Sequence, residues 1–386
     1  MPLRNTARSV AVLVGMLSMC GDQAAAAPVG QGNGEPALPG LMVETAYTGD
    51  VVHNLDPGIV AGDRKTVYLG LLDIGVQIDT GEAGWWQGGV LHVQAINMHG
   101  DQPSARYIGD LQVASNIEAE SHTLLYEAWY EQHFAADRAS LRIGLQDLNS
   151  ELYLSEDAAL FLNSSFGIGP EISANVPTST FPRPGFGVRL RLQPVDRLTL
   201  FIASYDGDPT TRKLSKSEGR MDIAEIDLGY RLGNALPGTF RFGAWRHTAV
   251  HPAPFGGQRF PGDRGYYVHF DQQVADWQGG GLDTFLHYGA APKERNAVDS
   301  CLAAGIRVAG PFANRPDDRF GIGMTRAGNL YAPGRRGFET TWELTYRLRL
   351  GKHISLQPSY QWIRHPQGNP ANRNIRVLIG RLMIDL

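Results

Sequence analysis

Cysteine is nearly absent from this sequence: there are two among 386 residues, and only Cys301 lies outside the amino-terminal segment. The rest of the chain therefore cannot form an internal disulfide, the usual support of small secreted domains. Long apolar runs are also missing. After the first 27 residues no stretch approaches the ~20 apolar residues that a spanning helix needs, and the mean hydropathy is -0.23. A helical membrane bundle and a disulfide-stabilised domain are both excluded.

An excess of one charge is missing as well. The chain has 35 Lys and Arg against 39 Asp and Glu, a net charge of -4. Without a basic stripe it lacks the electrostatic pattern of a nucleic-acid-binding protein. Its sequence also contains no phosphate-binding loop, no nucleophile elbow and no histidine cluster at metal-ligand spacing. We therefore expect no nucleic-acid partner, no cofactor and no metal.

The amino terminus has the pattern of a secretory signal peptide. Arg4 and Arg8 precede the short apolar core "SVAVLVGMLSM", and "AAAA" at 24–27 offers small residues for cleavage. The core is too short for a membrane anchor, and Met19 is a poor residue before a lipidated Cys20. We predict a removed signal peptide over 1–27 and a flexible segment over 28–40.

Short runs of alternating apolar and polar residues fill most of the remaining chain, and Gly, Pro, Asn and Asp separate them. They predict strands over 64–78, 88–99, 121–133, 139–147, 185–193, 197–206, 222–232, 239–248, 265–273, 281–289, 299–309, 318–326, 339–350, 354–363 and 374–386. Two further segments, 41–50 and 107–116, alternate less clearly. These segments number seventeen, whereas a closed barrel with both termini on one side needs an even number. We therefore expect sixteen strands, with one of those two segments miscounted.

The connections between these strands alternate in length. They are short at 193–197, 232–239, 273–281 and 350–354, and longer and polar at 206–222, 248–265, 326–339 and 363–374. Short turns at one end and long loops at the other are typical of a bacterial outer-membrane barrel. The break at 148–184 is too long for an ordinary connection, and we predict that it narrows the pore. The predicted fold is an all-β, antiparallel outer-membrane β-barrel over 41–386.

The hairpin at 342–362 shows the pattern most clearly. A three-residue turn at 351–353 would pair Leu350 with Ile354 and Trp342 with Trp362 on an apolar face, and would pair polar residues on the other face. A slip of one residue would destroy both faces. Paired Trp at the end of an apolar face is what a membrane interface favours. A soluble sheet also alternates, so this hairpin alone leaves a soluble fold open.

Several stretches resemble the OprB-type carbohydrate-selective porin family. They are "DLQVASNIEAE", "LLYEAWYEQHF", "LRIGLQDLNSEL", "FLNSSFGIGP", "GFGVRLRLQP", "ASYDGDP", "GAWRHT", "LQPSYQWIRHP" and "IRVLIGRLMIDL", spread over 41–386. The resemblance implies a sixteen-stranded barrel in the outer membrane of a Gram-negative bacterium, with infolded loops and sugars diffusing through it. It also implies outer-membrane lipid and the barrel assembly machinery as partners, and leaves a homo-oligomer possible. Leu386 departs from the Phe that usually ends such barrels.

A sugar-selective pore needs polar groups for hydroxyls and a few aromatic faces for the rings, and rings of charged side chains set pore selectivity. Parity and position predict the following candidates for contact with solute: on strands Glu127, Trp129, Arg142, Gln146, Asp147, Arg189, Arg191, Arg347, Arg349 and Gln361, and in the long segment Asn149, Glu151, Phe161 and Asn163.

Two other functions stay open from the sequence. One is a soluble secreted all-β sugar-binding protein or glycosidase, with Glu151 and Asp157, or Asp206 and Asp208, as paired carboxylates; with 39 acidic residues such pairs also arise by chance. The other is a barrel that serves as an adhesin or receptor through its external loops. Trp and Tyr at outward strand ends favour a barrel, because a soluble protein would bury or avoid them.

Overall fold

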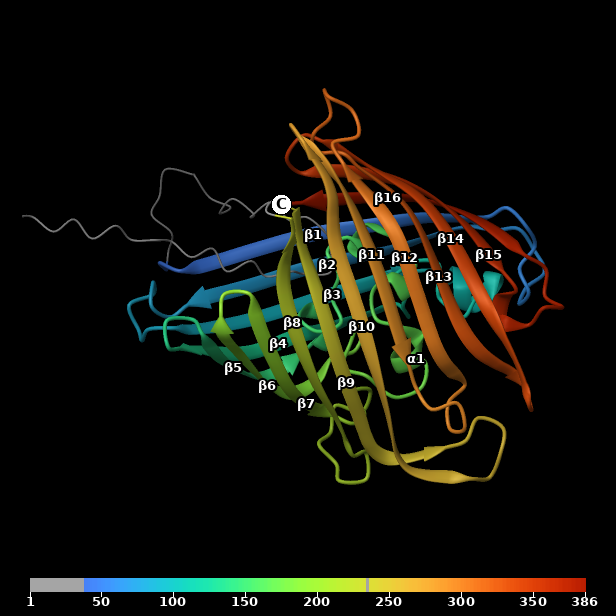
Figure 1. Cartoon of the computed structure of the whole chain (residues 1–386), viewed down its shortest axis with the longest axis horizontal. Helices are drawn as coiled ribbons and strands as arrows, with labels where there is room; N and C mark the ends of the chain where they lie inside the picture. Colours follow the sequence, from blue (N-terminus) through green and yellow to red (C-terminus); the bar gives the residue numbers. More distant parts are fainter. Residues whose placement is uncertain (1–37, 234–235) are drawn as a thin grey trace, which may run out of the picture.

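The computed structural model describes residues 38–233 and 236–386, so the predicted signal peptide and Cys20 lie outside the described residues. In these two ranges, sixteen strands form one closed barrel (Figure 1). The strands are β1 (Leu41–Asn54), β2 (Thr66–Asp79), β3 (Gly89–Gly100), β4 (His122–Phe134), β5 (Ala139–Gln146), β6 (Gly185–Val195), β7 (Leu198–Asp206), β8 (Arg220–Leu232), β9 (Leu236–Pro252), β10 (Arg259–Trp277), β11 (Gly280–Ala290), β12 (Val298–Ala309), β13 (Arg319–Ala332), β14 (Arg335–Leu350), β15 (Ile354–Arg364) and β16 (Ile375–Asp385). Each pairs antiparallel with its sequence neighbour, and β1 pairs with β16 to close the sheet. The prediction of sixteen strands in an antiparallel barrel is confirmed.

One of the two uncertain segments was wrongly read as a strand. Residues 41–50 belong to β1, but 107–116 do not form a strand. A short π-helix, η1 (Ser104–Ile108), ends at Gly109, whose φ is 82°. The backbone N–H groups of Leu111 and Gln112 then donate to the carboxylate of Glu339 instead of to a neighbouring strand. The alternating polarity of this segment therefore reflects packing inside the barrel and not strand pairing.

The alternation along the strands separates an inner from an outer face. The β14–β15 register pairs Leu350 with Ile354, Leu344 with Tyr360 and Trp342 with Trp362, as predicted. Trp342 is 44% exposed on the outer face, while Glu343 beside it is buried inside. Because the sheet is closed, each strand finds backbone partners on both sides, which lets an apolar outer wall face lipid.

Connections at the two ends of the barrel differ in length, as the sequence predicts in outline. At the end where β1 begins and β16 ends, which we call the short-turn end, 196–197, 278–279 and 351–353 are tight turns. At the opposite, long-loop end, 55–65, 101–121, 147–184 and 207–219 connect the strands.

Two of the loops predicted at the long-loop end are shorter than expected. The strands run further than their apolar alternation, so 253–258 replaces the loop predicted at 248–265, and 333–334 replaces the one predicted at 326–339. The β9–β10 hairpin projects past its neighbours (Figure 1). One connection at the short-turn end, 310–318, is also longer than a tight turn.

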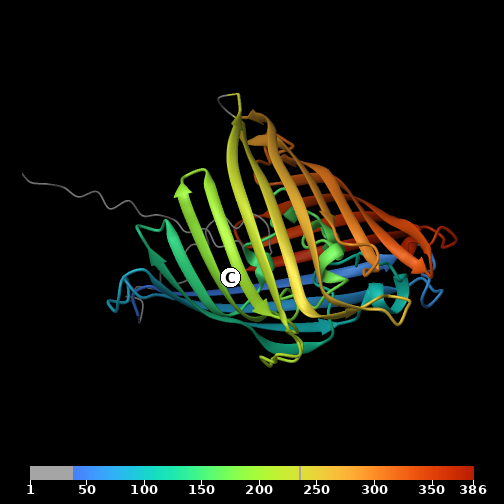
Figure 2. The ribbon, with the colours of Figure 1, turned by 60° about the horizontal axis from the view of Figure 1, so that its bottom comes forward.

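The segment 147–184 lies inside the barrel. It carries η2 (Leu148–Ser150), η3 (Ala158–Leu160), η4 (Ser164–Phe166) and α1 (Pro170–Ser173), and both views show this green stretch enclosed by the strands (Figures 1 and 2). No helix in the described ranges is both long enough and apolar enough to cross a bilayer.

The buried core is formed between this infolded segment and the inner faces of the strands. One cluster joins Leu148, Leu152 and Ile172 of the segment to strand residues such as Trp245 and Tyr267. A second cluster contains Phe161, Phe166 and Phe285. Gly321 and Gly323 leave the room that Phe161 occupies, since a Cβ at either position would lie 2.9 Å from its ring. The barrel therefore has a packed interior on the side that the segment covers.

Candidate functional site: the narrowed lumen

Inward-facing strand residues hold the segment 147–184 in place. The carboxylate of Glu343 on β14 accepts hydrogen bonds from the backbone N–H groups of Leu162, at 2.8 Å, and Asn163, at 3.0 Å. Glu225 on β8 accepts one from the N–H of Tyr153 at 2.9 Å. Because β8 and β14 lie on different walls of the barrel, the segment crosses the lumen between them.

A second segment, 101–121, also folds inward. Glu339 on β14 accepts from the N–H groups of Leu111 and Gln112 at 2.7 and 2.9 Å, and Gln361 Nε2 donates to the carbonyl of Ala114 at 2.7 Å. The two segments join directly, since the N–H of Asn116 donates to the carbonyl of Leu162 at 2.8 Å. Two segments therefore fold into the barrel, and sequence reasoning singled out one of them; that it narrows the pore stays a prediction.

A cluster of ion pairs connects the infolded segment to the wall at β5 and β6. Glu151 of the segment lies 2.6 Å from Arg189 Nε and 3.2 Å from Arg142 Nη1. Glu131 on β4 lies 2.8 Å from Arg142 and 2.9 Å from Arg189. Two guanidiniums and two carboxylates cancel in charge, and the Glu151 side chain is still 22% exposed.

An aromatic stack adjoins this cluster. The guanidinium carbon of Arg142 lies 4.0 Å from the centroid of the Trp129 ring, and that ring also stacks on His92, with the two ring centroids 4.7 Å apart. Trp129 Nε1 donates to Glu127 at 3.3 Å. Five of the predicted residues are therefore gathered at one place on the inner wall: Glu127, Trp129, Arg142, Glu151 and Arg189.

Further ion pairs continue along the inner wall, and sequence reasoning missed them. Arg241 on β9 lies 3.4 Å from Asp227 and 2.5 Å from Asp271. Arg307 on β12 lies 2.9 Å from Asp157 and 3.2 Å from Asp283. Arg381 on β16 lies 2.8 Å from Asp50. Inward parity in "FRFGAW" and "GIRVAG", the rule used for Arg142, would have found Arg241 and Arg307.

Arg241, Arg307 and Arg381 and their carboxylate partners form a belt of charged side chains on the inner wall. One of these carboxylates, Asp157, comes from the infolded segment. Burial raises its pKa to about 7, and the nearby Arg307 guanidinium opposes that shift. The belt offers many charged hydrogen-bonding groups but pairs each arginine with carboxylates.

Other predicted residues anchor the fold of the segment. Asp147 accepts from the N–H of Asn149 at 2.7 Å, and Gln146 Nε2 donates to the carbonyl of Gly187 at 2.8 Å. Asn163 caps η4 by accepting from the N–H of Ser165 at 3.1 Å. Buried side chains make most of these contacts: Gln146, Asp147, Asn149, Phe161, Asn163 and Gln361. Phe161 is 1% exposed in its phenylalanine cluster, so its ring supports the segment and does not face open lumen.

The three remaining predicted arginines lie toward the short-turn end. Arg191 Nη1 donates to the carbonyl of Asp137 at 3.1 Å. Arg349 Nη1 donates to Ser355 Oγ at 3.1 Å and lies 3.2 Å from Asp385. Arg347 is half-buried and opposite Arg319 in the sheet. The structure does not bring these three to the Arg142 cluster.

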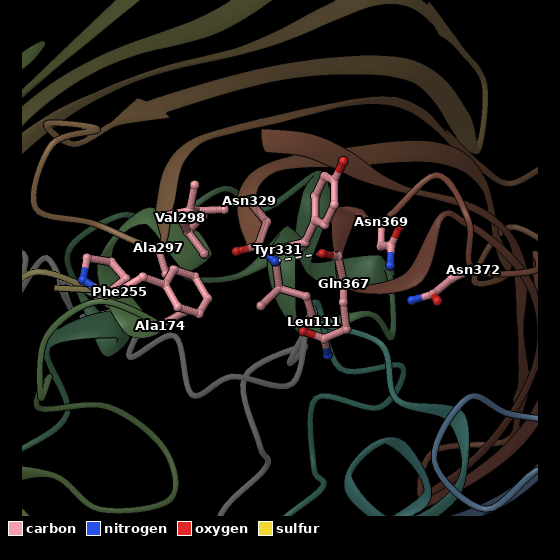
Figure 3. Close-up of a pocket in the computed structure, with 12 residues that line it drawn as sticks. Leu111, Ala174, Phe255, Ala297, Val298, Asn329, Tyr331, Gln367, Asn369 and Asn372 are labelled. Atoms are coloured by element: carbon pink, nitrogen blue, oxygen red, sulfur yellow. Dashed lines mark hydrogen bonds between the residues drawn. The ribbon is translucent and has the colours of Figure 1, made fainter. Parts of the chain in front are cut away.

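A pocket of about 480 Å³ with a mixed polar and apolar lining opens at the long-loop end (Figure 3). Amides and aromatic rings line much of it: Asn329, Gln367, Asn369, Asn372, Tyr331 and Phe255. Asn329 Nδ2 donates to the carbonyl of Gln367 at 2.7 Å, the dashed line in Figure 3. Amides that bond hydroxyls beside rings that cover apolar faces are the groups a sugar requires.

The acidic pairs considered for glycoside hydrolysis are not brought together as such. Glu151 is paired with Arg142 and Arg189, whereas Asp157 is paired with Arg307. Asp206 ends β7, and Asp208 caps its own turn by accepting from the N–H of Thr210 at 3.1 Å. Glu151 and Asp157 therefore form ion pairs with the barrel wall, and Asp208 stabilises a turn.

A closed barrel with an apolar outer wall, segments folded into its lumen and a belt of charged groups inside is an outer-membrane diffusion pore. The chain belongs to the OprB family of carbohydrate-selective porins, whose family model matches residues 63–386. It is an outer-membrane carbohydrate porin, and the resemblance read from its sequence is confirmed. The family implies a channel and not an enzyme, and the outward exposure of Trp342 and Trp362 disfavours a soluble sugar-binding protein.

Individual relatives agree with this assignment. Porin B of Pseudomonas aeruginosa is 23% identical over 388 residues, which cover 85% of this chain and 84% of that protein. The high pH structure of Pseudomonas putida OprB superposes with a TM-score of 0.80 at 19% identity, over 90% of this chain and 94% of that one. The low pH structure of the same protein gives a TM-score of 0.61 at 16% identity, over 90% and 93%. At these identities the solved structures support the fold alone.

Proposed function

We propose that monosaccharides and short oligosaccharides cross this porin by passive diffusion, and that they contact Glu151 of the infolded segment, whose side chain is 22% exposed and is held in place by the buried Arg142 and Arg189. The observation that carries this proposal is the ion-paired link between Glu151 of the infolded segment and the two wall arginines. It puts hydrogen-bonding groups beside an aromatic stack at the place where the segment meets the wall.

Charge supports a neutral solute. The two arginines and two glutamates of the cluster balance, so the site neither repels a sugar nor traps an ion. The exposed part of the Glu151 carboxylate can accept hydrogen bonds from sugar hydroxyls. Conduction needs contacts of this kind, strong enough to admit a solute and weak enough to release it.

The amide-rich pocket in Figure 3 is proposed as the first contact for sugar. We propose that the barrel is oriented as others of its class are. The long-loop end then faces the cell exterior, and the short-turn end faces the periplasm. A difference in sugar concentration drives the flow, so the mechanism requires no cofactor. We further propose that residues 1–27 are a cleaved signal peptide, that the barrel assembly machinery inserts the chain, and that a homo-oligomer is compatible with the fold.

Single-channel current in planar bilayers tests the proposed contact surface. Glu151→Gln removes one carboxylate from the cluster and leaves Arg142 and Arg189 with Glu131 alone, an excess of one positive charge. We expect the barrel to fold, selectivity to shift toward anions, and block by glucose or a short maltooligosaccharide to change at least about twofold. The matched control is Glu82→Gln in the exposed connection 80–88, which should change neither quantity.

If Glu151→Gln keeps both the ion selectivity and the sugar block of the parent channel, the solute path lies elsewhere in the lumen. A barrel that conducts ions but shows no sugar block at all would instead favour the alternative of an adhesin or receptor.

A further inference from the structure

A row of charged residues crosses the outer wall of the barrel at the long-loop end. The register aligns Ser204 of β7, Asp222 of β8, Arg246 of β9 and Arg264 of β10 side by side. Arg220 lies next to this row and bonds Asp222 Oδ1 at 2.8 Å. The Arg246 and Arg220 side chains are 60% and 57% exposed. An arginine on the lipid face is costly near the bilayer midplane and cheap near the interface, so this row marks the headgroup level.

The next row toward the membrane centre supports that position. It consists of Ile202, Ala224, Ala244 and Tyr266, in register on β7 to β10. Tyr266 is exposed on the outer face, as in the aromatic girdle of a membrane interface. The arginines thus lie one row outside the girdle.

The charge of this patch is unbalanced. Asp222 accepts from Arg246 Nη2 at 2.7 Å as well as from Arg220, and from Ser204 Oγ at 2.8 Å. Three guanidiniums against this one carboxylate leave two positive charges on a wall that faces lipid. The inner wall differs, because there each arginine cluster is matched by carboxylates.

An apolar groove of about 630 Å³ begins directly below the charged row. Ala224 and Ala244 face each other across β8 and β9 and form its floor. Val188, Leu190 and Ile202 line its side, and Arg220, Asp222 and Arg246 border its outer edge. A hollow with an apolar floor and a cationic edge matches a lipid, with a chain in the hollow and an anionic headgroup at the edge.

We propose that this wall binds a phosphorylated, multiply acylated lipid of the outer leaflet, with a phosphate held by Arg246 and Arg264 and one acyl chain on the Ala224–Ala244 floor. Arginine is suited to this role because its planar fork of donors matches phosphate oxygens bidentately. Basic pockets at membrane depth bind anionic lipid headgroups in the same way. The inference depends on the barrel fold and its orientation, and not on which solute crosses the lumen.

Lipid binding by the full-length mature porin in detergent tests the proposal. Native mass spectrometry would compare diphosphorylated lipid A, monophosphorylated lipid A and phosphatidylethanolamine as probes. We expect the diphosphorylated lipid to bind most tightly. The double variant Arg246→Gln/Arg264→Gln should weaken binding of diphosphorylated lipid A roughly 30-fold. Each arginine near an anionic membrane surface contributes about 1 kcal/mol of binding free energy, and the variant removes two.

The control has the same charge change at the other end of the barrel. Arg197→Gln/Lys352→Gln alters two exposed residues in the short turns 196–197 and 351–353 and should leave lipid A binding unchanged. Single-channel conductance should stay the same in both double variants, so failure of this proposal is separable from failure of the proposed sugar path.

A second variant tests the groove and does not depend on the arginines. Ala244→Phe fills the floor without altering charge and should weaken lipid A binding while the arginines remain. If Arg246→Gln/Arg264→Gln does not assemble, Ala244→Phe by itself tests whether this wall binds lipid A. The proposal is overturned if the assembled double glutamine variant binds diphosphorylated lipid A as tightly as the parent, or if Ala244→Phe has no effect. Displacement of lipid A by inorganic phosphate at equal concentration would leave only an anion site, and would overturn the lipid assignment.

Discussion

At the scale of single residues, position relative to the barrel wall decides what a side chain does. Glu343 and Leu344 are neighbours in sequence, yet Glu343 is buried inside and bonds the infolded segment, while Leu344 is 45% exposed on the outer face. In a closed barrel these faces meet a polar lumen and hydrocarbon, so the same substitution has opposite costs at adjacent positions.

Leu344→Arg tests this directly. An arginine on the lipid face near the midplane costs roughly 2–4 kcal/mol, so we expect the yield of assembled barrel to fall markedly. Leu214→Arg is the matched control, because Leu214 is highly exposed in the connection 207–219. The measurement is the fraction of folded protein after refolding into lipid vesicles, as a function of urea. Equal stability of the two variants would contradict the assignment of Leu344 to the lipid face.

At the scale of elements, the infolded segment depends on buried acidic groups. Glu171 on α1 is fully buried, and Tyr153 Oη donates to its carboxyl at 2.8 Å. Burial raises the pKa of Glu171 from 4.5 to about 7, and the bond from Tyr153 opposes that shift. The buried carboxyl is therefore neutral over much of the acidic range.

Because the pKa of Glu171 is raised, docking of the infolded segment depends on pH. A raised pKa in the docked state means that docking is strongest below pH 4.5 and weakens as the pH rises toward 7, by up to about tenfold per pH unit for this one proton. We expect the single-channel current of the parent to become noisier or larger between pH 5 and 8.

Glu171→Gln keeps an acceptor for Tyr153 but cannot ionise, so it should reduce this pH dependence. Glu82→Gln serves again as the control, since Glu82 is exposed in a connection at the short-turn end. A pH profile that is identical in Glu171→Gln and the parent would show that another group controls docking.

At the scale of the whole molecule, closure of the sheet stabilises every strand. β1 bonds both β2 and β16, so the chain has no free edge among its described strands. Removing the first strand would expose the edges of β2 and β16 together, and unpaired backbone groups are costly in lipid.

The molecule-scale prediction is therefore about closure. The mature porin should fractionate with outer membranes and migrate faster on gels when it is not boiled. A chain lacking 38–54 should lose this heat-dependent shift, whereas Leu214→Arg should keep it. Recovery of the complete mature chain as soluble periplasmic protein would refute membrane placement.

The sequence by itself determined the barrel. Side chains in a strand alternate with period two, so apolar and polar parity in segments such as 342–362 predicted the strands, their faces and the β14–β15 register. The same parity placed Arg142, Gln146 and Arg189 inside the barrel. The resemblance of the quoted stretches to the OprB family, and not their parity, pointed to the family whose model matches residues 63–386.

Tertiary structure alone decided what fills the lumen. Segment 107–116 alternates like a strand, but its backbone N–H groups donate to Glu339 on β14, more than two hundred residues along the chain. Glu151 and Asp157 are close in sequence, yet they form ion pairs with different strands. Glu151 pairs with Arg189 on β6, and Asp157 pairs with Arg307 on β12. Local periodicity reports only which face a residue is on. Which charges meet across a closed lumen depends on chain closure and on loop packing, which no short stretch of sequence contains.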